Sequence, residues 1–317
     1  MVGPLVSSLD FHRSMPGYAP TPLIGFGKYW VKDESNRFGL PAFKILGASW
    51  AVNQALGPAP TFAELAATVK HVTLVTATDG NHGRALAYLA RMLGVAARVY
   101  VPGDLPASTL QTIRDEGASV IDTGRPYDDA VQLAADSIDG HDVLIQDTAW
   151  PGYEDVPRWI VNGYDTLFSE IDEQYPGVPE LVVVPTGVGS LLQAALQHYR
   201  GRAKVLAVEP TTAACVGASL KAGQPVSLDT SAPTIMAGLN CGTVSSIAWP
   251  IIRDHLHAAV AVTDDQARAA MNLLHAHGIP AGPCGAAALT GAQLAAIPAS
   301  SVVLISTEGD PTASART

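Results

Sequence analysis

The chain has 317 residues, of which 48% are hydrophobic and 15% charged, a composition typical of a well-packed globular protein rather than a disordered one. Its formal net charge of −10 argues against nucleic acid and anionic membrane surfaces as partners, because affinity for phosphate backbones depends on clustered lysine and arginine. The length suits one large domain or two modest ones, each able to bury a core without disulfides.

The start of the chain, residues 1–22, lacks the basic region and apolar stretch of a secretory leader. No apolar run reaches the roughly 18 residues that a membrane span needs. The three cysteines, Cys215, Cys241 and Cys284, are odd in number and far apart, so they predict neither a disulfide framework nor a CxxC metal or redox site. We therefore expect a protein of the reducing cytoplasm with no membrane partner.

Residues 32–39 are polar and lead into a predicted helix with Lys44 at its start. A lysine amine is a nucleophile only when part of it is neutral, so burial against Phe43, Ile45 and Leu46 would help by lowering its pKa. A Schiff base with an aldehyde cofactor is the natural use of such an amine. A single lysine at a helix start is usually an ordinary surface residue, so this interpretation depends on the rest of the chain.

Short β-branched segments alternate with helical segments along the chain, a pattern typical of buried parallel sheets and of the α/β class. The predicted strands are 72–75, 98–101, 143–145, 181–184, 204–208 and 301–305. The predicted helices are 84–93, 108–116, 127–137, 158–174, 190–199 and 264–277. Composition alone shows no domain boundary.

A polar turn, residues 76–84, follows the first of these strands and precedes an apolar helix. Thr78 or Asp79 would suit the N-cap of that helix, which is the purely structural interpretation. The turn also brings backbone N–H groups and Asn81 to the carboxyl end of a strand, where open α/β sheets bind ligands. Both interpretations stay open for the turn taken by itself.

A glycine-containing loop, residues 186–190, joins the strand at 181–184 to the next helix. Its backbone N–H groups can converge on an anion, with the helix dipole and the Ser190 hydroxyl adding to the attraction. Leu192 breaks the GxGxxG dinucleotide pattern, and no GK[ST] follows to make a mononucleotide P-loop. The loop therefore indicates either a phosphate site or ordinary turn chemistry.

Two H-x-H pairs, His255 with His257 and His275 with His277, do not predict a metal site. Residues i and i+2 face apart on a helix, and no H-E-x-x-H pattern accompanies them. We expect no metal. A serine hydrolase is also unsupported, since the chain has no G-x-S-x-G elbow.

Taken together, these segments resemble the fold type II pyridoxal-phosphate enzymes, which include threonine dehydratase, threonine synthase and cysteine synthase. Within that family the chain looks most similar to the diaminopropionate ammonia-lyases. Five segments carry the resemblance in the family's order, namely residues 33–40, 77–84, 146–150, 236–242 and 306–310. The resemblance implies a two-domain α/β fold of the tryptophan synthase β type, with largely parallel sheets flanked by helices. It places a large cofactor-binding domain at 1–48 and 163–317 and a smaller mobile domain at 49–162.

The resemblance implies pyridoxal 5'-phosphate as the cofactor, bound covalently by Lys44, with Phe43 before the lysine and Asn81 beside the phenolic oxygen. Ser306, with Thr307 as the alternative, would face the pyridine nitrogen. The phosphate would be held by Gly187, Val188, Gly189 and Ser190. A neutral hydroxyl at the ring nitrogen makes a weaker electron sink than a carboxylate would, which suits elimination over transamination.

The resemblance also implies that Asp79 and Asp147 move the α-proton of an amino-acid substrate together with Lys44, although Asp147 alone would pass for a strand-end cap or a surface acid. The sequence does not decide which base serves which enantiomer. A carboxylate beside the substrate can also pair with the distal ammonium of 2,3-diaminopropionate and keep the leaving group protonated. The substrate site is expected to contain Thr78, Asp79, Gly80, Asn81, His82 and Asp147.

The expected activity is therefore α,β-elimination of 2,3-diaminopropionate to pyruvate and two molecules of ammonia by a cytoplasmic homodimer. The chain is shorter than expected for this subfamily, which keeps alternatives open. One is a related β-elimination or β-replacement enzyme acting on serine, threonine, cysteine or another β-substituted alanine. A second is an inactive relative that binds ligands, and a more distant one is a nicotinamide-dependent dehydrogenase.

Overall fold

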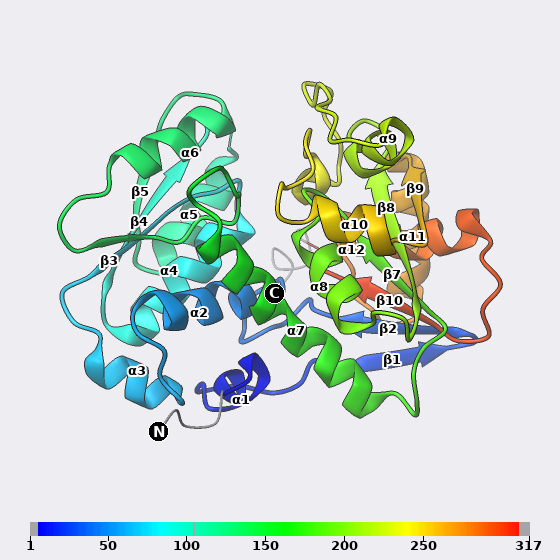
Figure 1. Ribbon diagram of the computed structural model, residues 1–317, viewed down its shortest axis with the longest axis horizontal. Helices are drawn as coiled ribbons and strands as arrows, with labels where there is room; N and C mark the ends of the chain where they lie inside the picture. Colours follow the sequence, from blue (N-terminus) through cyan, green and yellow to red (C-terminus); the bar gives the residue numbers. More distant parts are fainter. Residues whose placement is uncertain (1–5, 104, 311–317) are drawn as a thin grey trace. The chain divides into compact units, whose positions relative to one another are not determined.

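The computed structural model of the protein describes residues 6–103 and 105–310, and the chain falls into two compact units. The first unit joins the residues up to Tyr18 with Lys44–Thr166, and the second joins Ala19–Phe43 with the residues from Leu167 onward (Figure 1). The chain thus passes from one unit to the other at the Phe43–Lys44 peptide bond. The functional division expected from the resemblance, with a mobile segment at 49–162, stays a prediction.

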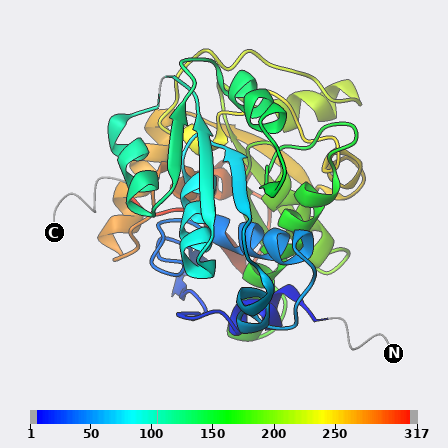
Figure 2. The same cartoon turned by 90° about the vertical axis from the view of Figure 1, so that its left-hand side faces the viewer.

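The first unit contains a four-stranded parallel sheet in the order β5-β4-β3-β6, whose strands stand side by side in Figure 2. Its strands are β3 (Thr73–Ala77), β4 (Ala96–Val101), β5 (Ser119–Asp122) and β6 (Asp142–Leu144). Its helices are α1 (Ser8–Arg13), α2 (Lys44–Ala55), α3 (Phe62–Thr68), α4 (Asn81–Leu93), α5 (Ala107–Asp115), α6 (Tyr127–Asp136) and the first part of α7 (Asp155–Gln174).

Helices cover both faces of this sheet. On one face Val75 of β3 packs with Ala134 of α6, and on the other Val99 of β4 packs with Ala87 of α4 and Ile113 of α5. Because successive strand residues point to opposite faces, a strand buried on both sides is apolar along its whole length. That is why β3 and β4 could be recognised as near-continuous hydrophobic runs.

The second unit contains a six-stranded sheet in the order β1-β2-β10-β7-β8-β9, parallel except for the antiparallel pair β1 and β2. Its strands are β1 (Leu23–Phe26), β2 (Tyr29–Asp33), β7 (Leu181–Pro185), β8 (Lys204–Pro210), β9 (Ala258–Val262) and β10 (Val302–Ser306). Its helices are the rest of α7, α8 (Ser190–His198), α9 (Cys215–Ala222), the 3-10 helix η1 (Ala237–Leu239), α10 (Trp249–His255), α11 (Asp264–Ala276) and α12 (Pro283–Ala295).

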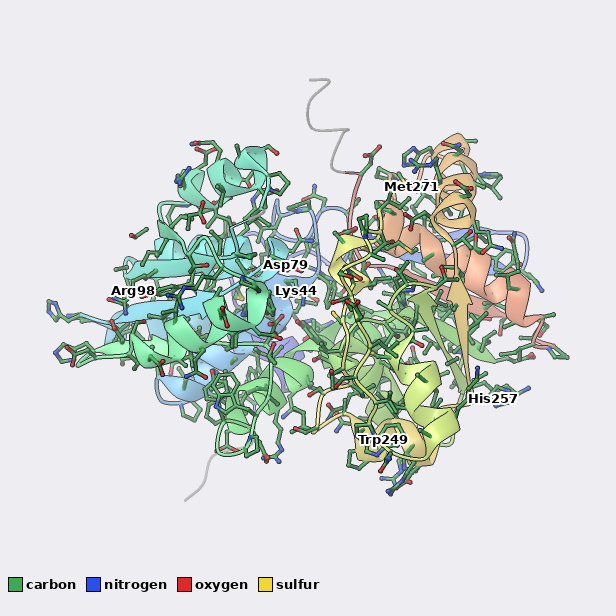
Figure 3. The ribbon with its side chains drawn as sticks, turned by 90° about the horizontal axis from the view of Figure 1, so that it is seen from above. Lys44, Asp79, Arg98, Trp249, His257 and Met271 are labelled. Atoms are coloured by element: carbon green, nitrogen blue, oxygen red, sulfur yellow. The ribbon has the colours of Figure 1, made fainter. Side chains whose placement is uncertain are left out.

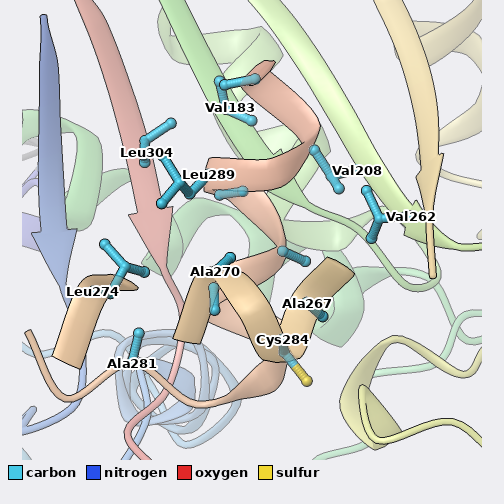
Figure 4. Packing of buried hydrophobic residues seen from close by; sticks show 14 of the residues in the cluster. Val183, Val208, Val262, Ala267, Ala270, Leu274, Ala281, Cys284, Leu289 and Leu304 are labelled. Carbon is cyan, nitrogen blue, oxygen red and sulfur yellow. The ribbon is translucent and has the colours of Figure 1, made fainter. Parts of the chain in front are cut away.

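Helix α12 lies in the core of the second unit. Its Leu289 packs in a buried cluster with Val183, Val208 and Leu304 from three strands of the sheet, as Figure 4 shows. Seven of the other twelve residues of this helix are alanine or glycine, and six of these seven are buried. Small side chains let a helix lie close to a sheet, so α12 fixes the positions of β7, β8 and β10 relative to one another.

A buried ion network holds the segment after β2 in the second unit. Glu170 of α7 accepts hydrogen bonds from Lys32 Nζ and Arg37 Nη1, each at 2.6 Å, and Arg37 Nη2 lies 2.7 Å from Glu34 Oε1. All four side chains are fully buried, and their charges sum to zero. Burial works to raise the pKa of Glu170, but the two cations outweigh it and lower that pKa to about 2. The network fixes the start of the polar segment that leads to Phe43.

The predicted α/β class, with two largely parallel sheets flanked by helices, is confirmed. Each predicted strand and helix corresponds to an observed one, and Lys44 is the first residue of α2. The sequence did not predict β1, β2, β5, β9, α1, α3, α9, α10 or α12, because these elements are short, carry charges on a strand or are rich in alanine. Within residues 6–103 and 105–310, no helix combines the length and apolar character needed to cross a membrane.

Candidate active site

Lys44 forms an ion pair with Asp147 inside the first unit. The Lys44 Nζ atom donates a hydrogen bond to Asp147 Oδ2 at 2.9 Å, and the two side chains are 29% and 16% exposed. Burial works to lower the pKa of Lys44, but Asp147 together with Tyr164 and Asp79 outweighs it, so that pKa is raised well above its usual value. Burial depresses the pKa of Lys44 as expected, but the expectation that the pKa as a whole is lowered is wrong for this state.

The carboxylate of Asp147 is correspondingly stabilised in its charged form. Burial works to raise the pKa of Asp147, but Lys44 and then His82 lower it by more, and the resulting pKa is about 2. His82 is buried, its Nε2 lies 2.8 Å from the carbonyl oxygen of Ile145, and its Nδ1 lies 4.0 Å from Asp147 Oδ2. Asp147 therefore lies between a lysine and a histidine that both favour its negative charge.

Asp79 is the second carboxylate of this cluster. It follows β3, and Figure 3 shows its side chain close to Lys44, with which it interacts electrostatically. Its side chain is exposed, yet desolvation by the surrounding protein raises its pKa. Lys44 opposes this rise and the charge of Asp147 adds to it. The two aspartates thus differ in proton affinity although both interact with one lysine.

The turn before α4 is held by Thr78. Its buried Oγ1 accepts hydrogen bonds from the backbone N–H groups of Gly80 at 2.9 Å and Gly83 at 3.1 Å. The N-cap residue is Gly80, and Thr78 rather than Asp79 supplies the side-chain oxygen that accepts from these N–H groups. Asn81 is the first residue of α4, with His82 next to it, so both lie at a helix N-terminus that favours anions.

The predicted phosphate loop lies in the second unit, between β7 and α8. Gly189 is the N-cap of α8 and has a φ of +99°, a left-handed conformation that favours glycine. A Cβ atom at Gly187 would lie 2.8 Å from Cys241 Sγ, so this position also requires glycine. The carbonyl oxygen of Val188 accepts a hydrogen bond from the N–H of Ser245 at 2.8 Å, and Ser190 starts the helix. The loop has the tight backbone of an anion cradle.

Ser306 is the last residue of β10 in the second unit and is 1% exposed. Its Oγ, like that of its neighbour Thr307, makes no hydrogen bond to any residue that the structure describes. A Cβ atom at Gly285 would lie 2.7 Å from Ser306 Oγ, so glycine there makes room for the serine. The Thr307 carbonyl oxygen accepts a 3.4 Å hydrogen bond from the N–H of Phe43. A buried hydroxyl without a protein partner can bond to a ligand atom.

Three residues around Lys44 and Asp147 were given no role from the sequence. Tyr164 of α7 is buried beside Lys44, and desolvation raises the pKa of its phenol to about 12. Gln146 donates a hydrogen bond from its side chain to Asp147, and its backbone N–H donates to the hydroxyl of Tyr153. Gln146 lies within a segment that carried the resemblance, so its neighbourhood could have been suspected. No sequence pattern pointed to Tyr164, which lies 120 positions after Lys44 and reaches it only through the fold.

The second histidine pair contacts backbone carbonyl oxygens. His275 Nε2 lies 3.0 Å from the carbonyl oxygen of Ala281, and His277 Nδ1 lies 2.9 Å from that of Leu273. In the described part of the chain, no group of three or more His, Cys, Asp or Glu side chains is arranged to hold a metal ion.

Comparisons with known proteins agree with the chemistry of these residues. The family model described as "Pyridoxal-phosphate dependent enzyme" matches residues 15–308. A diaminopropionate ammonia-lyase of Salmonella typhimurium is 38% identical over 298 residues, which cover 84% of this chain and 74% of the relative. An L-threonine dehydratase of Mycobacterium leprae is 32% identical over 97% of this chain and 73% of its own length. The crystal structure of the holo diaminopropionate ammonia-lyase of Escherichia coli superimposes with a TM-score of 0.88 at 33% identity, covering 97% of this chain and 89% of that one.

Proposed function

The chain belongs to the pyridoxal-phosphate-dependent enzyme family, and we propose that it catalyses the α,β-elimination of 2,3-diaminopropionate, with one water, to pyruvate and two molecules of ammonia. The observation that carries this choice is the pair of carboxylates, Asp79 and Asp147, that both interact with Lys44. Relatives that share 36 to 38% identity with the chain are diaminopropionate ammonia-lyases, which supports the same substrate.

The residues present fit pyridoxal phosphate. Lys44 would hold it covalently, and the unpartnered hydroxyl of Ser306 would face the pyridine nitrogen, with Thr307 as the alternative. Asn81 would contact the phenolic oxygen. The loop of Gly187, Val188, Gly189 and Ser190 would hold the phosphate through its backbone and the α8 N-terminus. When bound, this group supplies an electron sink for negative charge that develops at the α-carbon of an amino acid.

The two aspartates are suited to different proton tasks because their environments separate their pKa values. Asp79, whose pKa is raised, can accept and return a proton closer to neutral pH. Asp147, whose pKa is lowered to about 2, remains a carboxylate and can pair with a cation. Both lie within reach of the Lys44 amine, which is itself a base once it no longer carries its extra proton. We propose that these three groups remove the α-proton according to the hand of the substrate.

A second cationic group on the substrate explains why a fixed negative charge is useful. The distal ammonium of 2,3-diaminopropionate can pair with a carboxylate that Lys44 would otherwise neutralise. That contact keeps the leaving nitrogen protonated, so that it departs as ammonia. The N-terminus of α4 would bind the substrate carboxylate through the backbone N–H groups of Asn81 and His82, in a turn that the contact between Thr78 and Gly80 holds in place. A substrate with a β-hydroxyl has no such need for a second carboxylate.

A second candidate is elimination from serine or threonine. The L-threonine dehydratase relative matches 97% of this chain, which supports the shared chemistry of β-elimination. We also propose a cytoplasmic homodimer that functions in amino-acid metabolism. Cys215 is a buried cysteine that forms no disulfide, which supports a reducing compartment. Light scattering coupled to size-exclusion chromatography measures the oligomeric state.

The experiment that tests the function compares substrates on the purified holoenzyme. Pyruvate and ammonia are measured with D- and L-2,3-diaminopropionate, and in parallel with serine and threonine. We expect turnover of a diaminopropionate enantiomer with two ammonia released per pyruvate. Turnover of the hydroxy amino acids without any turnover of the diamino acid would favour the second candidate instead. A chain that cannot be loaded with pyridoxal phosphate would contradict both.

A further inference from the structure

Gln146 lies between the segments that carry the two aspartates. It follows β6, which pairs in parallel with β3, so the carboxyl ends of both strands meet at one edge of the sheet. The Gln146 side chain is fully buried. Its Oε1 accepts hydrogen bonds from Thr76 Oγ1 and from the N–H of Ala77, each at 2.9 Å. Ala77 is two residues before Asp79, so these bonds hold the start of that turn.

The other end of the same amide reaches toward Asp147. Gln146 Nε2 donates to the hydroxyl oxygen of Tyr127 at 3.1 Å and to Asp147 Oδ1 at 3.4 Å. The amide orientation follows from its partners, because a flipped amide would set its NH₂ group against the N–H donor of Ala77. The donor end of Gln146 is therefore the end that faces the carboxylate.

The backbone of Gln146 is fixed as well. Its N–H donates to the Tyr153 hydroxyl at 2.9 Å, and that hydroxyl donates to the carbonyl oxygen of Leu144 at 2.8 Å. Tyr153 also stacks on Trp150, with ring centroids 4.3 Å apart. The loop that carries Asp147 is thus held at its backbone by Tyr153 and at its side chain by Gln146.

We infer that Gln146 is a positioning residue that couples the two catalytic carboxylates, by tying the end of β3 to the side chain of Asp147. This inference rests on the proposed function, in which Asp79 and Asp147 both act on the substrate. Lys44 binds the Oδ2 atom of Asp147, whereas Gln146 binds the Oδ1 atom, so the two contacts together set the rotation of the carboxylate. The contact from Gln146 does not depend on Lys44, so it would remain when Lys44 holds another partner.

The decisive variant is Gln146→Glu, which keeps the size of the side chain and the acceptors for Thr76 and Ala77. It replaces the donor facing Asp147 with an acid, in a place that Lys44, His82 and Asp79 also face. We expect kcat to fall up to about 100-fold with little change in KM, since small misplacements of catalytic groups have effects of that size. The ratio of D to L turnover should move in the same direction as in Asp147→Asn, and the acid limb of the pH–rate profile should move to higher pH.

The matched control is Gln132→Glu on α6. Gln132 also donates to an aspartate, Asp136 at 2.7 Å, but both side chains lie on the surface of the same unit. We expect this variant to keep the kcat, the enantiomer ratio and the pH profile of the unmodified protein. Equal pH profiles and equal enantiomer ratios in Gln146→Glu and Gln132→Glu would overturn the inference, even if Gln146→Glu lowered the melting temperature.

A second readout needs neither substrate nor cofactor. In cofactor-free protein labelled with ¹³C at aspartate carboxyl carbons, Asp147 is assigned by its loss in Asp147→Asn and then titrated. Gln146→Glu should raise the Asp147 pKa by about one unit or more, because a like charge is placed beside it, and Gln132→Glu should leave it in place. An unmoved Asp147 pKa would count against the coupling. If the holoenzyme turns over neither enantiomer, the proposed function fails. The titration still tests whether Gln146 acts on Asp147, because it needs no turnover.

If Gln146→Glu does not fold, Tyr127→Phe gives the same answer in a milder form. It removes only the hydroxyl that accepts from Gln146 Nε2 and leaves the glutamine in place. We expect a loss of kcat of a few fold, with the enantiomer ratio again moving toward that of Asp147→Asn. A Tyr127→Phe enzyme with the unmodified ratio would contradict the inference.

Discussion

Lys44 Nζ and Asp147 Oδ2 lie 2.9 Å apart, and each group shifts the proton affinity of the other toward the charged form. In the cofactor-free protein, the amine that is proposed to hold the cofactor is thus an ammonium group paired with a carboxylate. In the proposed function Lys44 would hold the cofactor, and Asp147 would then be available to pair with a cationic group of the substrate.

The ion pair predicts a pH-dependent contribution to stability in the cofactor-free protein. The folded pKa of Asp147 is about 2, below the ordinary value of 3.8, so the pair stabilises the fold fully above pH 3.8 and is lost as the pH falls toward 2. We expect Lys44→Ala to lower the free energy of unfolding by about 1–2 kcal/mol near neutral pH, allowing for partial exposure. Urea unfolding at a series of pH values measures this difference, which should shrink below pH 4. A difference that stays constant down to the lowest measurable pH would mean that the lost lysine packing, not the charge, is responsible.

Removing either carboxylate should impair turnover without removing the cofactor. We expect Asp79→Asn and Asp147→Asn each to reduce kcat by about 10²–10⁴-fold, the usual range for loss of a general base. Because the two carboxylates lie on different segments, one variant should lose more of its turnover of the D enantiomer of 2,3-diaminopropionate and the other more of its turnover of the L enantiomer. Asp128→Asn, at an exposed aspartate of α6, is the control and should behave as the unmodified protein. Identical losses for both enantiomers in both variants would argue against divided roles.

The unpartnered hydroxyl of Ser306 predicts a variant that separates cofactor affinity from stability. Ser306→Ala should weaken cofactor binding about 2–10-fold, the equivalent of one neutral hydrogen bond, while the cofactor-free protein stays at least as stable. Thr307→Val is the matched comparison, since Thr307 Oγ1 also lacks a partner among the described residues. Fluorescence titration of both variants with pyridoxal phosphate decides between them. A larger loss in Thr307→Val would assign the ring contact to Thr307.

Some of the site could be read from the sequence because its residues follow strands. Asp79, Asn81 and the loop at Gly187 each come directly after a predicted strand and before a predicted helix, where ligands bind in α/β sheets. Their local backbone follows from glycine and capping chemistry, so sequence patterns were informative there. Lys44 was noted at the start of a predicted helix, but only the resemblance gave it a cofactor role.

Other features depend on tertiary contacts that sequence patterns do not contain. Burial lowers the pKa of Lys44, but Asp147, more than 100 positions later, together with Tyr164 and Asp79 outweighs that effect and leaves the pKa raised. Tyr164 reaches the lysine from a long amphipathic helix with no motif. Strand β2 was missed because Lys32 and Asp33 break its apolar pattern, and only the partners of Lys32 explain how that charge is buried.

The loop between β7 and α8 predicts that a glycine substitution there weakens cofactor binding, whereas the same substitution at a positive-φ glycine elsewhere affects only stability. Gly189→Ala would place a Cβ atom 2.9 Å from Ile252 Cδ1 in a residue with a φ of +99°. We expect the cofactor dissociation constant to rise at least about tenfold, which is about 1.4 kcal/mol. Gly201→Ala is the control, because Gly201 has a φ of +70° but nothing within 4 Å of the added atom. It should lower the unfolding free energy by about 1–2 kcal/mol and leave cofactor affinity unchanged. Equal cofactor affinities in the two variants would show that the loop does not bind the phosphate.

The buried ion network predicts a large loss of stability from a single neutral substitution. Lys32→Met would leave Glu170 fully buried with one cation fewer, and we expect a loss of about 3–5 kcal/mol in unfolding free energy near neutral pH. Because the Glu170 pKa is lowered from 4.5 to about 2, this loss should diminish as the pH falls from 4.5 toward 2 and the carboxylate becomes protonated. Arg158→Ala, which breaks the exposed pair with Glu154, should cost no more than about 1 kcal/mol. Urea unfolding of the cofactor-free variants measures both, and a Lys32→Met loss no larger than that of Arg158→Ala would show that the network adapts to the missing charge.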